Sequence, residues 1–224
     1  MARPASQLKS LMQIKYSLGN VSHSNEIIEF KRSDILIYDD LLAHDEQSRL
    51  LQFLSLPSWN FGAYSDQSKD ASRYWYKHFA GYFNKVDDIT NIERELEHNA
   101  PPAHAMWSKL KEKIFSGHKL TRCYANGYPY GSEGSLHIDA NVPTHFTGIY
   151  YPHLDWSPNY AGETVFFDRA CKDIIASIYP KPNRFVVFPG VIPHVARGVS
   201  RRCQDLRVTL MFKTEKVAAA APSH

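Results

Sequence analysis

The spacing of apolar and polar residues divides the chain into a first part with helices and a second part rich in short strands. A β-branched run at 34–38 predicts a strand, and the apolar spacing after Asp45 predicts a helix that ends before Pro57. Two further helices are predicted between 88 and 115, separated by Pro101-Pro102. Six β-type runs then follow, at 119–124, 145–151, 163–167, 174–178, 184–188 and 205–212. Turn residues such as Asn126-Gly127 separate these runs, and the pattern favours a sandwich or jelly roll over alternating βαβ units.

Length and composition fit one domain of a soluble globular protein. The chain has 224 residues, of which 43% are hydrophobic and 22% are charged. We expect a flexible N-terminal arm at 1–25, a single domain at 26–216, and a disordered, alanine-rich tail at 217–224. The aromatic residues between 59 and 83 are predicted to pack mostly in the core.

Charge and cysteine content exclude several classes of function. A net charge of +3 that is dispersed along the chain gives no reason to predict DNA or RNA as a partner. No apolar run resembles a signal peptide or a membrane span, so a cytoplasmic protein without membrane contact is expected. The three cysteines, without a C-x-x-C pair, are expected to be free thiols. Hydrolase motifs such as Gly-x-Ser-x-Gly and phosphate-binding glycine loops are absent from the sequence.

A His-x-Asp motif with a more distant histidine is the main candidate for chemistry. On an extended segment, the side chains of His137 and Asp139 leave the same side of the backbone. Together with His194, they would supply the two imidazoles and one carboxylate that hold Fe(II) and leave three coordination positions open. The alternative is the end of a strand, with a solvated aspartate and a partly buried histidine.

The last β-type run carries a second candidate feature. Strand alternation places Arg207, Thr209 and Met211 on one face, and Leu206, Val208, Leu210 and Phe212 on the other. A buried guanidinium requires an anionic partner, and its planar shape suits a carboxylate. The alternative is an edge strand with Arg207 in water.

These motifs follow one another in a characteristic order. After His-x-Asp come an aromatic strand and the segments Ala161-Gly162-Glu163-Thr164, Arg184–Phe188, Pro193-His194-Val195 and Arg207-Val208-Thr209. This order resembles the Fe(II)/2-oxoglutarate-dependent dioxygenases, specifically their prolyl-4-hydroxylase-like branch. The resemblance implies a mainly β protein with flanking helices, in which a double-stranded β-helix (jelly roll, cupin-like) occupies about 119–213. The N-terminal helices would pack outside this core.

The resemblance also implies roles for individual residues. His137, Asp139 and His194 would ligate Fe(II), and Arg207, assisted by Thr209, would bind the distal carboxylate of 2-oxoglutarate. Tyr151 and Tyr124 match tyrosines that contact the same cosubstrate, although the segment from Tyr124 to His137 is longer than usual. The family commonly has glycine where this chain has Ala161, a departure that leaves the ligands unaffected.

The function predicted on this basis is hydroxylation of an unactivated C–H bond of a small metabolite, with O2 consumed and succinate and CO2 released. Ascorbate is a candidate stimulant. Asp139 argues against halogenation, whereas desaturation and epimerisation stay open. The alternatives are hydroxylation of a prolyl or other side chain in a protein, and a non-enzymatic jelly-roll metal-binding or sensor protein. The sequence leaves the oligomeric state undetermined.

Residues beside the motifs support weaker predictions. His145 and His153 are expected to be structural or exposed, and Arg184 is expected to form an ion pair. The candidates for the substrate pocket are Trp156, Tyr128, Tyr130, Asn141 and Arg169. A basic cluster, interpreted as a solvated loop, consists of Arg197, Arg201 and Arg202.

Overall fold

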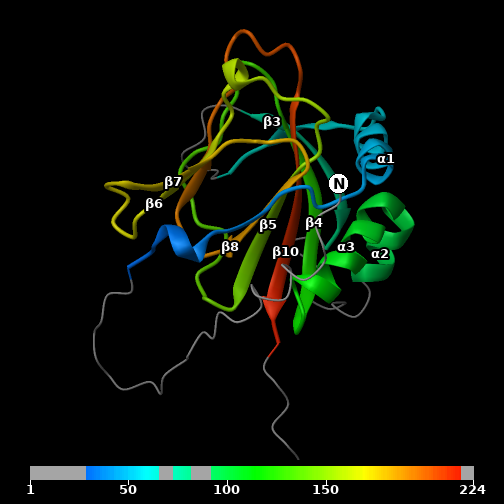
Figure 1. Cartoon of the computed structure of the whole chain (residues 1–224), viewed down its shortest axis with the longest axis horizontal. Helices are drawn as coiled ribbons and strands as arrows, with labels where there is room; N and C mark the ends of the chain where they lie inside the picture. Colours follow the sequence, from blue (N-terminus) through cyan, green and yellow to red (C-terminus); the bar gives the residue numbers. More distant parts are fainter. Residues whose placement is uncertain (1–28, 66–72, 82–91, 218–224) are drawn as a thin grey trace, which may run out of the picture.

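The computed structural model describes residues 29–65, 73–81 and 92–217 (Figure 1). The predicted arm at 1–25 and most of the predicted tail lie outside these residues. The helices are α1 (His44–Ser55), α2 (Ile92–Asn99) and α3 (Pro101–Lys113), with short 3-10 turns at Arg32–Asp34 and Pro158–Tyr160. The strands are β1 (Leu36–Tyr38), β2 (Asn60–Ala63), β3 (Tyr74–Ala80), β4 (His118–Tyr128), β5 (His145–Tyr151), β6 (Thr164–Phe167), β7 (Ile174–Ile178), β8 (Arg184–Pro189), β9 (His194–Ala196) and β10 (Arg207–Lys216).

The described strands form two antiparallel sheets that face each other. The large sheet has the order β1-β8-β5-β10-β4-β3-β2, and the small sheet has the order β7-β6-β9. In Figure 1 the small sheet lies on one side of the large sheet, and the three helices lie on the other side. This arrangement is the predicted jelly roll with its helices packed outside.

The helices and one face of the large sheet share the main hydrophobic core. Leu50 of α1, Leu96 of α2 and Trp107 of α3 are buried in the same cluster as Leu210 and Phe212 of β10. The two prolines separate the last two helices as predicted, because Pro101 begins α3 at a position where the missing N–H costs nothing. Burial of this apolar layer leaves the opposite face of the large sheet free to carry polar groups.

The alternation predicted for the last strand is confirmed. β10 pairs with β5 on one side and β4 on the other, so it is a central strand and not an edge. Val208, Leu210 and Phe212 face the helices, whereas Arg207 and Thr209 face the space between the sheets. The alternative of an exposed Arg207 is therefore wrong.

One predicted turn is wrong for an identifiable reason. Asn126-Gly127 was predicted as a turn but lies within β4, opposite Thr209 and Val208. A Cβ atom on Gly127 would lie 2.6 Å from the Leu206 side chain, so glycine serves close packing here and not a turn.

The aromatic segment enters the core less than predicted. Tyr74 and Phe79 are buried, but Phe61, Tyr64 and Trp75 are exposed. These exposed residues belong to β2, β3 and the segment after β2, and β2 and β3 are the last two strands at one end of the large sheet in the described part of the chain. Tyr82 and Phe83 lie outside the described residues.

Two further expectations can be checked on the described residues. Cys123, Cys171 and Cys203 are all free, as predicted. Among the helices of the described ranges, none combines the length and apolar character needed to cross a membrane.

His153 connects the loop after β5 to β10 and makes stability depend on pH. Its Nε2 accepts the Val208 N–H at 3.0 Å, and burial, with a contribution from Arg207, lowers its pKa to about 4. An unfolded histidine titrates near 6.5, so the unfolded chain binds more protons and stability falls as the pH drops from about 6.5 towards 4. His153 is thus structural, as expected.

We predict that the free energy of unfolding decreases by about 2 kcal/mol more in wild type than in His153→Gln between about pH 7 and pH 5. The glutamine oxygen can still accept the Val208 N–H but does not titrate in this range. Urea unfolding of both proteins at the two pH values measures the difference, in which other titrating groups cancel. Equal changes in the free energy of unfolding of the two proteins between these pH values would show that His153 does not cause the pH dependence.

Candidate active site

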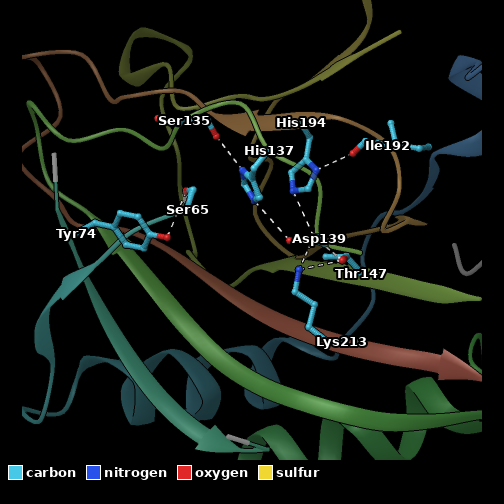
Figure 2. Close-up of polar contacts among 9 residues, drawn as sticks. All are labelled: Ser65, Tyr74, Ser135, His137, Asp139, Thr147, Ile192, His194 and Lys213. Atoms are coloured by element: carbon cyan, nitrogen blue, oxygen red, sulfur yellow. Dashed lines mark hydrogen bonds and ion pairs between the residues drawn. The ribbon is translucent and has the colours of Figure 1, made fainter. Parts of the chain in front are cut away.

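A cavity of about 550 Å³ lies between the two sheets and is lined by six of the seven predicted site residues. Its floor is the inner face of the large sheet, to which alternate residues of β3, β4, β5 and β10 contribute. His137, Asp139 and His194 approach it from the opposite side (Figure 2). The cavity therefore brings side chains from widely separated parts of the sequence to one place.

The His-x-Asp segment is held against β9 by backbone hydrogen bonds. The N–H of His137 donates to the His194 carbonyl at 3.1 Å, and the His194 N–H donates back at 2.9 Å. The Asp139 N–H donates to the Gly190 carbonyl at 2.8 Å. As a result, one potential ligand atom from each of the three side chains lies within 4.8 Å of the others.

Both imidazoles are oriented in the same way. Nδ1 of His137 lies 2.8 Å from the Ser135 carbonyl, and Nδ1 of His194 lies 2.9 Å from the Ile192 carbonyl (Figure 2). Because a carbonyl can only accept, each Nδ1 carries a proton, which leaves each Nε2, on the Asp139 side, as the potential ligand atom. Burial lowers the pKa of His194 to about 4, so this ring is neutral at physiological pH.

Asp139 completes the set as an ionised carboxylate. Burial alone would raise the pKa of Asp139, but the ammonium of Lys213 holds it well below its usual range. Thr147 donates to Oδ2 at 2.6 Å, and Lys213 contacts the same oxygen. Two imidazole nitrogens and one carboxylate oxygen on one face are a donor set that fits Fe(II).

Arg207 lies at the other end of the cavity. It is 1% exposed, and its Nε donates to the Gly162 carbonyl at 2.6 Å, while one terminal nitrogen donates to Thr164 at 3.1 Å. The rings of Tyr128 and Tyr151 lie 5.6 and 5.7 Å from its guanidinium carbon. Within the described part of the chain, Arg207 forms no ion pair with a carboxylate. A buried, uncompensated guanidinium is suited to an anion from outside the protein.

The turn before β6 brings the backbone close to Arg207. Gly162 has a φ of +85°, and a Cβ at this position would lie 2.9 Å from Cδ of Arg207. Ala161 has a φ of +56°, a conformation that glycine adopts more easily. The alanine that departs from the family pattern is therefore accommodated with some backbone strain, away from the three candidate ligands.

The remaining predicted cosubstrate residues also face the cavity. Tyr151 is fully buried, and its hydroxyl lies 2.8 Å from Thr164, beside Arg207. Thr209 lines the floor next to Arg207, and Tyr124 lies opposite Met211, towards the candidate metal ligands. Burial raises the pKa of Tyr124, and the charge of Asp139 raises it further. Six of the seven predicted site residues thus line one cavity, and Tyr151 lies beside Arg207 at its end.

Most predictions for the substrate pocket are wrong. Among the five candidates for the substrate pocket, only Tyr128 lines the cavity. Trp156 is buried beside Val199 and Cys203, Tyr130 is 62% exposed, and Asn141 and Arg169 are also exposed. These assignments were wrong because closeness in sequence to a motif does not fix the direction of a side chain in a loop.

Several cavity residues were missed by sequence reasoning. They come from β3, β4 and the segment after β2, and the most prominent are Tyr64, Tyr74, Tyr76, His78 and Arg122. Lys213 of β10, which contacts Asp139 beside the cavity, was also missed. For Lys213 a signal existed, because it continues the alternation of Arg207, Thr209 and Met211. β3 was not predicted as a strand, so its alternation carried no signal.

The other polar predictions agree with the structure. Arg184 pairs with Asp39, with Nε 2.7 Å from Oδ1. The basic cluster lies on the surface, where Arg197, Arg201 and Arg202 are exposed and do not line the cavity.

Comparison with protein-family models and with curated protein sequences gives no match. Solved structures do match. A prolyl hydroxylase from Trichoplax adhaerens, in complex with a peptide fragment of the hypoxia-inducible factor oxygen degradation domain, aligns over 83% of this chain and 84% of its own, with a TM-score of 0.56 and 14% identity. An oxidoreductase of the 2OG-Fe(II) oxygenase family from Burkholderia pseudomallei aligns over 84% of this chain and 88% of its own, with a TM-score of 0.56 and 14% identity. The chain has the fold of the 2-oxoglutarate- and Fe(II)-dependent oxygenases.

A third match shows how widely this fold is used. The non-haem α-ketoglutarate-dependent epimerase SnoN from nogalamycin biosynthesis aligns over 82% of this chain and 76% of its own, with a TM-score of 0.53 and 11% identity. At these identities the likeness establishes the fold alone, and the chemistry of this oxygenase-like chain is argued from its own residues.

Proposed function

We propose that this protein is an Fe(II)- and 2-oxoglutarate-dependent oxygenase that hydroxylates a C–H bond of a small metabolite and releases succinate and CO2. One observation carries the proposal. The cavity has a two-histidine, one-carboxylate cluster on one side and a buried arginine without a carboxylate partner in the described residues at its end. A dicarboxylate that also ligates a metal would satisfy both features at once.

His137, Asp139 and His194 would hold the iron through two Nε2 atoms and one carboxylate oxygen. When bound, the iron would activate O2 and couple its reduction to oxidative decarboxylation of 2-oxoglutarate. The chain contributes the orientation of its ligands, which the carbonyls of Ser135 and Ile192 fix through Nδ1.

Arg207 would bind the distal carboxylate of 2-oxoglutarate. Its Nε is already engaged by Gly162, which fixes the guanidinium plane, and Thr209 borders the same space. The rings of Tyr128 and Tyr151 flank the guanidinium and keep water from it. Tyr124, nearer to the metal ligands, would contact the opposite end of the cosubstrate.

The cavity supports a small molecule as the primary substrate. Its volume of about 550 Å³ is within the range of small-molecule sites, and it must also hold the cosubstrate. Beyond the candidate metal ligands it is lined by Tyr64, Tyr76 and His78 from the β2 and β3 end of the sheet. These side chains combine aromatic surface with polar groups, as in pockets that orient a compact ligand.

A protein substrate is the second candidate. One matched structure is named as a complex with a peptide, and β2 is an edge strand whose Gly62 and Ala63 border the cavity. An extended peptide could pair with such an edge. Its exposed neighbours Phe61 and Trp75, with ring centroids 5.2 Å apart, would then contact the peptide.

The test is anaerobic titration of the Fe(II)-loaded protein with 2-oxoglutarate, monitored by the visible charge-transfer absorption of the chelate. We expect a saturable band that is absent without iron. Succinate release with O2 and ascorbate, across panels of metabolites and of proline-containing peptides, then identifies the substrate class, and product mass separates hydroxylation from desaturation or epimerisation. Iron binding without the band would favour the non-enzymatic metal-binding or sensor alternative.

A further inference from the structure

Lys213 is a partly buried cation that the proposed chemistry does not require. It lies on β10, where it follows Arg207, Thr209 and Met211 on the cavity-facing side, and its side chain is 16% exposed. Figure 2 shows its ammonium group reaching from β10 to Asp139 and Thr147. A lysine in this position must act on the candidate metal ligand that it contacts.

The contacts on Asp139 differ between its two oxygens. Oδ2 accepts the Thr147 hydroxyl at 2.6 Å and also contacts the Lys213 ammonium. Lys213 donates in turn to Thr147 at 3.0 Å, which closes a triangle of three groups. Nε2 of His137 lies 3.5 Å from Oδ1, and Nε2 of His194 lies 3.4 Å from Oδ2, so both oxygens face the candidate metal position. The difference is that two donors, Thr147 and Lys213, already occupy Oδ2 and neither contacts Oδ1.

We propose that Lys213, together with Thr147, is a positioning residue that restricts Asp139 to binding iron through Oδ1 alone. The inference rests on the proposed function. A carboxylate that ligates through one oxygen leaves three of the six positions of an octahedral site open, which suffice for a chelating 2-oxoglutarate and O2. A carboxylate that ligates through both oxygens leaves two positions, so the cosubstrate and O2 would compete.

The burial of the pair makes the restriction effective. Asp139 and Lys213 are 11% and 16% exposed, so water cannot easily replace the ammonium. Detaching Lys213 from Oδ2 would leave a buried charge without its partner. The lysine thus holds Oδ2 more firmly than an exposed ion pair would.

Lys213→Met tests the proposal, because methionine keeps the length and apolar stem of lysine and removes the ammonium. We measure Mn(II) binding from the spectroscopic signal of the free ion, and 2-oxoglutarate binding from the charge-transfer band of the anaerobic Fe(II) protein. We expect the 2-oxoglutarate affinity to fall about tenfold or more. Mn(II) affinity should be unchanged or higher, because a positive charge beside the ion is gone and Oδ2 is freed.

The comparison of the two affinities separates positioning from a merely structural role. A loss of 2-oxoglutarate affinity that exceeds any loss of Mn(II) affinity by about tenfold supports the proposal. Any smaller difference, including parallel loss of both ligands, overturns it. If wild type binds Mn(II) but gives no 2-oxoglutarate band, the proposed function itself fails, before the variant is considered.

Thr147→Val is the matched second variant. Valine has nearly the shape of threonine, so this change removes one donor to Oδ2 and keeps the ammonium. We expect the same pattern with a smaller loss of 2-oxoglutarate affinity, about fivefold. If Lys213→Met does not fold, this variant decides the question: a loss of 2-oxoglutarate affinity about fivefold beyond any loss of Mn(II) affinity supports the proposal, and parallel losses or an unchanged 2-oxoglutarate affinity overturn it.

Discussion

Replacement of Arg207 by methionine is expected to abolish 2-oxoglutarate binding and to leave metal binding intact. The guanidinium is 1% exposed and lies at the opposite end of the cavity from the candidate metal ligands. Loss of a buried, charge-assisted contact to a carboxylate costs several kcal/mol, so the affinity should fall at least about 100-fold. Titration of the Fe(II) protein with 2-oxoglutarate measures this fall, and the affinity for Mn(II) is measured in parallel to show that metal binding is intact.

Arg184→Met is the matched control for this experiment. Arg184 lies on β8 in the same large sheet and pairs with Asp39. It does not line the cavity, so its replacement should lower stability without changing 2-oxoglutarate affinity. Arg207→Lys keeps the charge but loses the planar fork, and an intermediate affinity is expected. A full charge-transfer band at unchanged 2-oxoglutarate concentration in Arg207→Met would show that the anchor lies elsewhere.

Arg207 and Lys213 lie on the same face of β10, and under the two proposals they would act at opposite ends of the cosubstrate. Replacement of Arg207 would remove the contact to the distal carboxylate, whereas replacement of Lys213 would change how many coordination positions the metal offers. Both variants should bind 2-oxoglutarate weakly. The two variants should differ in their relative affinities for shorter and longer dicarboxylates. Only the contact with Arg207 depends on the distance from the metal to the far carboxylate.

The sequence was most informative where the alternation of an extended segment determines the direction of its side chains. In β10, the period of two places Arg207 and Thr209 in the cavity and Leu210 in the core, whatever the neighbouring strands are. The His-x-Asp spacing likewise predicts two ligands on one side of an extended segment, and the structure brings His194 to meet them.

The sequence was least informative where pairing with distant strands decides whether a segment forms a strand and which way its side chains face. The segment that forms β3 reads locally as a cluster of aromatic residues, and only pairing with β4 turns Tyr76 and His78 towards the cavity. Asn126-Gly127 has the local signature of a turn, but the packing of Leu206 selects a strand. The role of Thr147 depends on contacts between β5, β10 and the His-x-Asp segment, which no local pattern reports.

Replacement of His194 by alanine is expected to remove metal binding and, with it, all turnover. The variant deletes the Nε2 donor but keeps the backbone hydrogen bonds between residues 194 and 137, which do not involve the side chain. Changes to groups that merely support a metal ligand typically cost 10- to 100-fold in affinity. Loss of the ligand itself should therefore lower Mn(II) affinity by more than about 100-fold and eliminate the charge-transfer band.

Two controls make the result specific to ligation. His98→Ala changes an exposed histidine of α2 and should bind metal like wild type. His194 is 4% exposed and packs against Phe166 and Phe188, so its replacement leaves a buried space that added imidazole can enter. Partial recovery of metal binding with imidazole, in a variant whose unfolding is still cooperative, would tie the loss to the missing nitrogen. Unchanged Mn(II) affinity in His194→Ala would show that the three side chains approach one another for a structural reason and not to hold a metal.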